Sequence, residues 1–150
     1  MDAFTLMEKD HRKVEEIFKK LLKTGDEDVK KRESLFQELK NELDAHAHME
    51  ENVFYPMMEK DESTRELAME FYGEHNEVKN MLRELEKMAH DSGVWMAKLQ
   101  VLEENVNHHV DEEEHELFPK AKKLMDKEKS NEIGDEMQKS KEAFLAKLLR

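Results

Sequence analysis

The sequence contains no cysteine, four glycines, two prolines and only 7% aromatic residues. The absence of cysteine excludes disulfides, thiolate metal ligands, iron–sulfur clusters and cysteine nucleophiles, and it points to a reducing compartment. No apolar run approaches the roughly 20 residues that span a bilayer, and residues 1–10 lack the basic segment and apolar run of a signal peptide. We therefore expect a cytoplasmic protein that does not associate with membranes.

Positive charge is also scarce, because 25 Lys and Arg residues face 37 Asp and Glu residues and leave a net charge of −12. Such a surface repels phosphate backbones, so nucleic acid is not an expected partner. At 150 residues the chain fits one domain, residues 1–150. Charged residues make up 41% of it and hydrophobic residues 37%, which is typical of helices with charged surfaces rather than of a β protein.

Apolar residues recur every three or four positions in four stretches, as they do on the buried face of an amphipathic helix. These stretches predict helices near residues 4–21, 29–58, 64–89 and 94–117. A weaker pattern predicts a C-terminal helix near residues 130–149, packed across the others. Pro56 is expected to bend or end the second helix because proline removes a backbone donor, and Pro119 holds the matching position in the fourth.

One segment occurs twice, as residues 43–56 and residues 106–119, and each copy ends in an aromatic residue followed by proline. Each copy also places a histidine four residues before a glutamate, and that glutamate six residues before the proline. The two pairs are His46/Glu50 and His109/Glu113. The chain therefore contains two related halves.

Two further histidines extend the repeat. His11 and His75 are 64 residues apart, and His46 and His109 are 63 residues apart. Each half thus offers a histidine and then His-x-x-x-Glu. If the predicted turns are right, His46 and His75 each lie about 12 residues, or about 18 Å, from the turn between their helices, and therefore at one level of the bundle. His75 and His109 are matched in the same way across the next turn.

These four histidines and two glutamates fall on otherwise apolar stripes, so folding would carry them into the core. An ionised carboxylate without a partner is strongly unfavourable there. Positions i and i+4 share a helix face, so each His-x-x-x-Glu pair directs two donors into one space. Six such donors are too many for one tetrahedral zinc site but suit two ions bridged by two carboxylates. Imidazole and carboxylate without thiolate favour iron, while manganese and zinc remain open.

The motifs resemble those of the hemerythrin-like, or HHE, family of non-haem di-iron proteins over about residues 4–125. The matching motifs are Asp10-His11, His46-x-x-x-Glu50 with Phe54-Tyr55-Pro56, Glu74-His75, and His109-x-x-x-Glu113 with Leu117-Phe118-Pro119. The resemblance implies an antiparallel up-down four-helix bundle with a short C-terminal helix. It also implies two irons joined by an oxide or hydroxide bridge, with His11 and His46 on one, His75 and His109 on the other, and Glu50 and Glu113 bridging.

Two departures from the oxygen-carrying hemerythrins bear on function. Those proteins place a further histidine four residues after the one that corresponds to His75, and here that residue is Lys79. They also use an aspartate-type second bridge in a shorter spacing, whereas Glu113 repeats Glu50. With two histidines per iron, more coordination positions are left for water, oxide or an exogenous ligand, which argues against a dedicated oxygen carrier.

Other polar and aromatic residues have simpler interpretations. We expect His48, His108 and His115 to be solvated or to lie outside the ligand set, His90 to be on the surface, and Tyr55 and Tyr72 to pack in the core. The spacing of Glu8-x-x-His11 and Glu112-x-x-His115 also occurs in ferritin-like di-iron proteins. These two motifs fall at unrelated places in the halves, so this match is weak.

Three functions follow from the sequence. The first is a di-iron protein that binds O2 or a related small ligand for sensing, storage or carriage. The second is a di-iron enzyme that handles peroxide or nitric oxide, for example as a catalase. In the third, the metal only stabilises the bundle. No catalytic acid, base or nucleophile stands out, and the sequence leaves the oligomeric state open.

Overall fold

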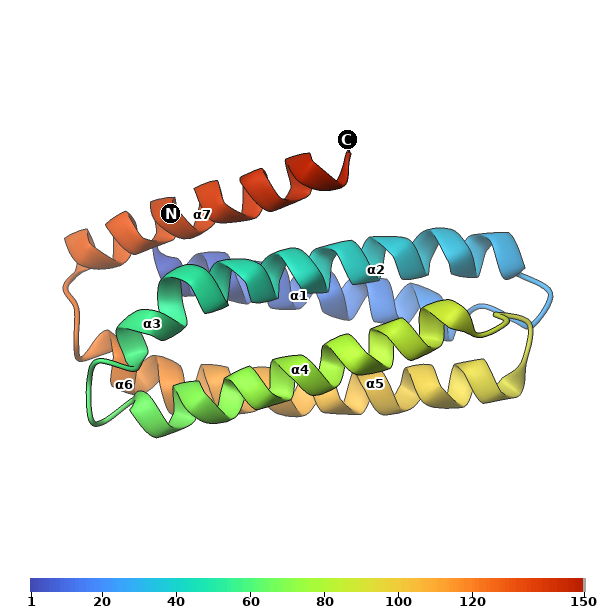
Figure 1. Cartoon of the computed structure of the whole chain (residues 1–150), viewed down its shortest axis with the longest axis horizontal. Coiled ribbons are helices and arrows are strands. Elements are labelled where there is room, and N and C mark those ends of the chain that lie inside the picture. Colours follow the sequence, from blue (N-terminus) through green and yellow to red (C-terminus); the bar gives the residue numbers. More distant parts are fainter. Residues whose placement is uncertain (150) are drawn as a thin grey trace.

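Four long helical segments run alternately in opposite directions, and a fifth crosses one side of them (Figure 1). The computed structural model describes residues 1–149. Its long helices are α1 (Ala3–Leu22), α2 (Val29–Met49), α4 (Arg65–Lys87), α5 (Gly93–Glu112) and α7 (Lys127–Leu148). The predicted all-α bundle is confirmed, and residues 1–149 contain no strand. The C-terminal helix has 22 residues and is as long as the helices of the bundle, rather than short.

The second and fourth segments continue through their prolines by way of a widened turn. They continue as η1 (Glu50–Phe54) and α3 (Tyr55–Met58), and as η2 (Glu113–Leu117) and α6 (Phe118–Lys122). Both η elements are π-helical turns. In an α-helix the proline ring collides with the carbonyl four residues earlier, and a π turn relieves that collision. The expected bend at each proline is therefore a π turn that begins at the glutamate of the repeat.

Side-chain caps fix the start of three helices. Asp2, Ser92 and Asp126 accept hydrogen bonds from the backbone N–H groups of Thr5, Trp95 and Lys129, respectively. These caps satisfy N–H groups that have no partner within the helix. The first turns of α1, α5 and α7 are thus determined locally by the sequence.

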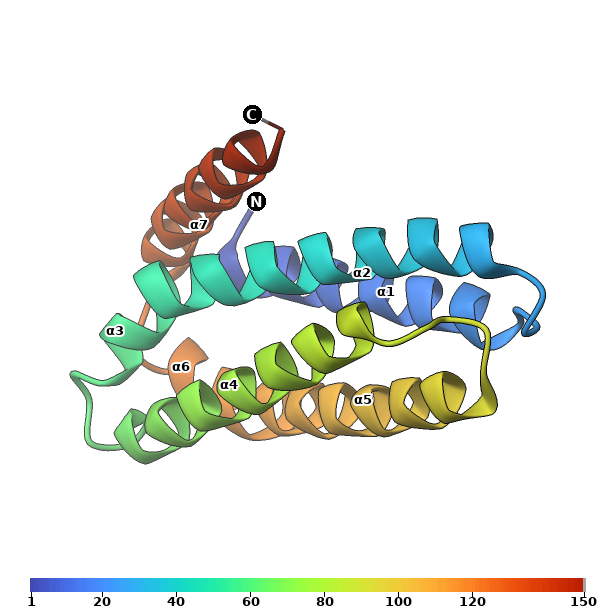
Figure 2. The ribbon, with the colours of Figure 1, turned by 45° about the vertical axis from the view of Figure 1, so that its right-hand side comes forward.

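Helix α7 packs against α1 and α2 and crosses them at a steep angle, which is clearest in the turned view (Figure 2). Its buried face carries Ser130, Ile133, Gly134, Met137 and Lys141. A Cβ atom at Gly134 would collide with the backbone of Met1 and Asp2, so glycine permits the close approach of α7 to the N-terminal segment.

The hydrophobic core consists of two clusters. One surrounds α3, α6 and the start of α7 and includes Phe4, Met7, Phe54, Phe71 and Phe118. The other fills the opposite end of the bundle and includes Phe18, Phe36, Leu82, Trp95 and Leu99. A layer of buried polar residues lies between them. Within the described residues 1–149, no helix is long and apolar enough to cross a membrane.

Candidate metal centre

The structure brings together all six residues that the sequence predicts as ligands. They come from α1, α2, η1, α4, α5 and η2, and none is more than 7% exposed: His11, His46, Glu50, His75, His109 and Glu113. Their donor atoms fall into two groups that could each hold a metal ion. The predicted common level of the histidines is therefore found in the fold.

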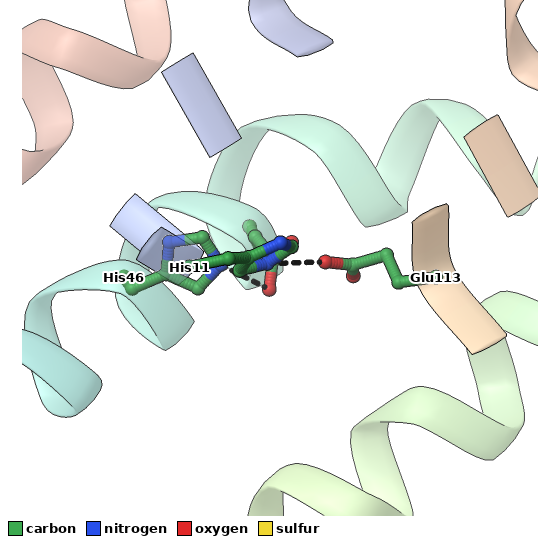
Figure 3. A group of neighbouring side chains, drawn as sticks. His11, His46 and Glu113 are labelled. Atoms are coloured by element: carbon green, nitrogen blue, oxygen red, sulfur yellow. Dashed lines mark ion pairs between the residues drawn. The ribbon is translucent and has the colours of Figure 1, made fainter. Parts of the chain in front are cut away.

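The first group consists of His11, His46, Glu50 and Glu113, whose ligand atoms all lie within 4.8 Å of one another. His11 Nε2 lies 3.1 Å from Glu113 Oε1, and His46 Nε2 lies 3.2 Å from Glu50 Oε1. Figure 3 shows His11 and His46 side by side, with Glu113 reaching towards them from the opposite side of the bundle.

The second group consists of Glu50, His75 and His109. The Nε2 atoms of the two histidines are 3.2 Å apart, and His75 Nε2 is 3.2 Å from Glu50 Oε1. His109 Nε2 lies 3.5 Å from Glu113 Oε2. Each glutamate therefore touches one histidine of each pair, which is the geometry of a carboxylate shared by two ions.

Within the described residues 1–149, four of these atoms are buried and make no hydrogen bond. They are His11 Nε2, His46 Nε2, Glu50 Oε2 and Glu113 Oε1. A buried polar atom without a partner costs about 1–3 kcal/mol, so four at one point are a substantial cost. A cation bound between them would remove it, and the donor set of the structure therefore fits a metal.

A carboxylate supports each of the four histidines from behind. In each case the distance from His Nδ1 to the carboxylate is 2.6–2.9 Å, and the pairs are His11/Glu114, His46/Asp10, His75/Glu51 and His109/Glu74. An Nδ1–H that donates to a carboxylate leaves the Nε2 lone pair facing inward, which is the arrangement found at metal sites.

These supports form a closed ring around the bundle. Asp10 of α1 supports a histidine of α2, Glu51 of η1 supports one of α4, Glu74 of α4 supports one of α5, and Glu114 of η2 supports one of α1. The sequence pattern did not predict a role for these four carboxylates. A signal was present in the sequence, because in each half one carboxylate directly precedes the first predicted histidine ligand and another directly follows the predicted glutamate ligand.

Tyr55, which the sequence analysis assigned to core packing, reaches the centre with its hydroxyl group. This hydroxyl donates to Glu113 Oε2 and lies 3.1 Å from Glu50 Oε1. It also lies 3.3 Å from His75 Nε2 and 3.4 Å from His109 Nε2. The π turn places residue i+5 beside residue i, and therefore the phenol beside Glu50. Tyr72 stays outside, with its hydroxyl 3.4 Å from the Glu51 carbonyl.

Charges within the centre compensate one another when no metal ion is bound. Burial opposes protonation of His109, but the charge of Glu113 and hydrogen bonds with Glu113 and Glu74 outweigh it and raise the pKa to about 10. The pKa values of the other three histidines are raised as well, against burial, by their carboxylate partners. Burial opposes ionisation of Glu113, yet His109 and His11 hold its pKa well below the usual range. In the metal-free protein, protons on the histidines therefore supply the positive charge that a bound cation would supply.

A small cavity of about 40 Å³ adjoins the four histidines. Its remaining walls are mostly aliphatic: Val14, Leu43, Asp44, Ala47, Val78, Lys79, Leu82, Val106 and Val110. The cavity shares Asp44, Lys79 and Leu82 with a neighbouring surface groove. Lys79, which replaces the further histidine of the oxygen carriers, lies 3.3 Å from Glu51 Oε2.

The remaining histidines lie outside the two groups. His108 and His115 have side chains that are 71% and 73% exposed, and His48 packs against Phe144 with its ring tilted. His90, predicted to lie on the surface, instead packs against Phe36 and Trp95 with both ring nitrogens buried. The prediction was wrong because the turn between α4 and α5 brings His90 against Phe36 of α2 and Trp95 of α5.

The two Glu-x-x-His motifs have different surroundings. His11 lies in the centre, but its partners are glutamates of η2 rather than Glu8, which is exposed. His115 pairs with Asp111 on the surface. A third possible cation group, Glu74 with His108 and Glu112, is partly exposed and adjoins the buried layer through the contact of Glu74 with His109. The ferritin-like spacing is therefore not used as such.

Two similar proteins cover the chain to different extents. An uncharacterised hemerythrin-like protein of Schizosaccharomyces pombe is 30% identical over 135 residues, which are 89% of this chain and 66% of that protein. A protein of Nostoc sp. named DNA nickase is 25% identical over 148 residues, or 99% of this chain and 41% of that protein. The chain thus spans just under two thirds of one relative and less than half of the other.

The fold matches a solved structure from Mycobacterium kansasii, a hemerythrin HHE cation binding domain-containing protein. The TM-score is 0.87 at 21% identity, and the match covers 99% of this chain and 90% of that one. Residues 2–121 match the family described as Hemerythrin HHE cation binding domain. This match spans the whole bundle and all six buried ligand candidates, and the chain therefore belongs to the hemerythrin HHE cation-binding domain family.

Proposed function

We propose that this protein binds two iron ions at a His4Glu2 centre and that the centre binds O2 or a related small ligand for sensing, storage or carriage. The single observation that carries the proposal is the convergence of six buried donors, four of which have an atom without a hydrogen-bond partner. No neutral arrangement of these side chains satisfies all of them, whereas two divalent cations do.

The proposed ligands follow the two geometric groups. His11 and His46 hold one ion, His75 and His109 hold the other, and Glu50 and Glu113 are shared. Iron is preferred because imidazole and carboxylate suit it and no thiolate is present, with manganese and zinc as the alternatives to be tested. A di-iron pair, when bound, supplies electrons to a small ligand.

The protein contributes a dry pocket and a proton donor. The cavity of about 40 Å³ is large enough for a diatomic molecule, since one water needs roughly 10–15 Å³ on the same measure. Its aliphatic walls favour uncharged ligands. The Tyr55 hydroxyl donates a hydrogen bond to Glu113 within the centre, and burial together with the charges of Glu113 and Glu50 raises its pKa well above the ordinary value, so it keeps its proton.

The second candidate is an enzyme that handles peroxide or nitric oxide. The observation that favours it is the same buried phenol, because a proton donor within hydrogen-bond reach of a reacting oxygen is a general requirement of such chemistry. In the third candidate, the metal only stabilises the bundle. That function does not require a cavity beside the histidines, so the cavity argues against it.

We do not propose nucleic acid as a partner of this chain. The Nostoc relative is named DNA nickase, but the net charge of −12 opposes DNA binding by this chain, so we propose a small ligand instead. We also propose that residues 1–150 form one domain. The absence of cysteine favours a cytoplasmic location, which we also propose. The same small-ligand function is proposed for any longer protein that contains this chain.

Metal analysis with an optical spectrum tests the proposal. Anaerobic reconstitution is expected to give about two irons per chain, and the di-ferrous protein is then mixed with O2 and, separately, with peroxide. A reversible oxygenated spectrum supports ligand binding, whereas sustained O2 release from peroxide supports the enzyme. One zinc per chain without iron would refute the assignment, and spectral silence towards both reagents would leave the structural metal.

A further inference from the structure

Lys141 occupies an unusual position for a lysine. It lies on the buried face of α7, seven residues after Gly134 and four after the fully buried Met137, where the helix stripe would place an apolar side chain. Its side chain is only 11% exposed. Lysine is almost never buried unless it is paired, so its partners should explain its position.

Two carboxylates hold the ammonium group. Lys141 Nζ lies 2.7 Å from Asp10 Oδ1 and 2.6 Å from Glu42 Oε1. The other oxygen of Asp10 accepts the Nδ1–H of His46 at 2.9 Å. A continuous chain of short polar contacts therefore links the C-terminal helix to the back of a proposed metal ligand, entirely within the protein interior.

The other carboxylates of the ring have no comparable partner. Glu114 pairs with Arg12, whose side chain is 54% exposed, and Glu51 pairs with Lys79, which is 33% exposed. Contacts of this kind are screened by water and worth little. Within residues 1–149, the ion pair that Glu74 makes is with His109, and no Lys or Arg side chain of that range pairs with it. The contact between Lys141 and Asp10 is therefore the only one of the three that is shielded from solvent.

We propose that Lys141 is a positioning residue for the His11/His46 metal site: it fixes the Asp10 carboxylate, which in turn fixes the ring of His46. Through this contact, helix α7 supports the His11/His46 site and does not support the His75/His109 site. The inference rests on the proposed function, because it assigns Lys141 a role in holding a metal there.

The test compares Lys141→Met with three other variants. Lys141→Arg keeps the charge, and Lys13→Met removes the exposed lysine that contacts the same Glu42 at 3.1 Å without touching Asp10. Phe144→Ala weakens the packing of α7 on His48 but leaves the ion pair in place. Co(II) is titrated into each variant in two backgrounds, His109→Gln and His46→Gln, each of which retains one complete histidine pair.

Lys141→Met is expected to weaken Co(II) binding about tenfold at the His11/His46 pair, the size typical of a lost partner behind a metal-binding histidine. It should also change the visible spectrum of that ion. The His75/His109 pair should keep its affinity and spectrum, Lys141→Arg should restore most of the loss, and Lys13→Met and Phe144→Ala should have little effect.

The proposal is overturned if both pairs weaken equally, or if Phe144→Ala reproduces the effect, because Lys141 would then act only through the docking of α7. It is equally overturned if Lys141→Met lowers thermal stability but changes neither affinity nor spectrum. Should Lys141→Met fail to fold, Lys141→Gln replaces it, since it removes the charge but keeps a polar end and most of the length of the side chain.

A measurement without metal separates this proposal from the proposed function. In the metal-free protein the His46 Nδ1–H is expected to give a protected NMR signal that Lys141→Met shifts or broadens and Lys13→Met does not. Absence of metal binding in the wild-type protein would refute the proposed function, while a shifted His46 signal in Lys141→Met would still show that Lys141 positions the His46 ring. An unchanged His46 signal in Lys141→Met would refute the positioning role alone.

Discussion

The two histidine pairs come from repeated sequence, yet their surroundings differ. The His11/His46 pair has Phe118 stacked near it and a buried lysine behind Asp10. The His75/His109 pair has the Tyr55 hydroxyl within 3.3–3.4 Å of both rings. Tyr55 and Phe118 occupy equivalent places in the two repeats, so one hydroxyl group distinguishes them.

This difference bears on the proposed function, because the groups that would hold the metal are distinct from the groups that would act on its ligand. The ligands and the ring of carboxylates are nearly symmetric, which suits two ions of the same kind. The phenol, by contrast, faces one pair, and the contact from α7 reaches the other. We infer that one side of the centre is tied to the outer helix and that the other carries the proton donor.

The largest expected effect comes from the shared glutamates. Replacing Glu50 or Glu113 by Ala should abolish binding at both sites, because each carboxylate touches a histidine of each pair. Metal analysis after anaerobic reconstitution measures the loss. His46→Ala is the matched comparison, and it should cost one ion and leave the other. Retention of one tightly held ion in Glu50→Ala would show that this carboxylate does not bridge.

The next effect is the pH dependence of the metal-free protein. The pKa of His109 is raised from 6.5 to about 10, so its stabilising contribution is complete below pH 6.5 and is lost as the pH rises through about 10. The free energy of unfolding in urea should fall between these pH values, by up to about 5 kcal/mol for this group, because each unit of pKa shift corresponds to about 1.4 kcal/mol.

The matched control for that pH dependence is His109→Gln, which should show a shallower fall over the same range. Titration of surface lysines affects both proteins, so the difference between the two curves isolates the histidine. Parallel curves for the two proteins would contradict the assigned pKa. The sign would be reversed if burial, rather than Glu113, dominated at this residue.

Tyr55→Phe makes the two repeats alike at this position. It removes the hydroxyl that donates to Glu113 and contacts Glu50, and leaving buried acceptors unpaired costs about 1–3 kcal/mol. We expect the optical spectrum of the reconstituted centre and its reactivity with peroxide to change while metal content is retained. Tyr72→Phe, which lies beside Tyr55 but outside the centre, should leave both unchanged.

The smallest effect is expected from Lys79→Met. Lys79 contacts Glu51 as Lys141 contacts Asp10, but its side chain is 33% exposed, and such a pair contributes about 0–1 kcal/mol. The affinity of the His75/His109 pair for Co(II) should change less than the His11/His46 affinity does in Lys141→Met. An equal change would show that burial of the cation is not what distinguishes the two supports.

Much of the site was predictable because its chemistry is local. The His-x-x-x-Glu spacing places two donors on one helix face, and the repeat interval places the halves at one level. These rules apply within single helices and across short turns. The same rules failed for His90, whose burial depends on the path of a turn rather than on helix periodicity.

The roles of Tyr55 and Lys141 could not be predicted in this way. An α-helical wheel does not place Tyr55 beside Glu50, and the π turn that does so becomes visible only in the structure. Lys141 lies 131 residues from Asp10 along the chain, and its side chain appears on the stripe of α7 as an ordinary polar interruption. Only the packing of α7 on α1 and α2 gives it a partner.

The sequence by itself determined the helices, the six buried donors and their family, because periodicity and spacing act over a few residues and the donors are costly to bury without a cation. The tertiary structure decided how the two halves differ. Which carboxylate supports which histidine, which repeat presents a hydroxyl and which site touches the outer helix all depend on contacts between helices far apart in the chain. Such contacts are set by packing rather than by local pattern.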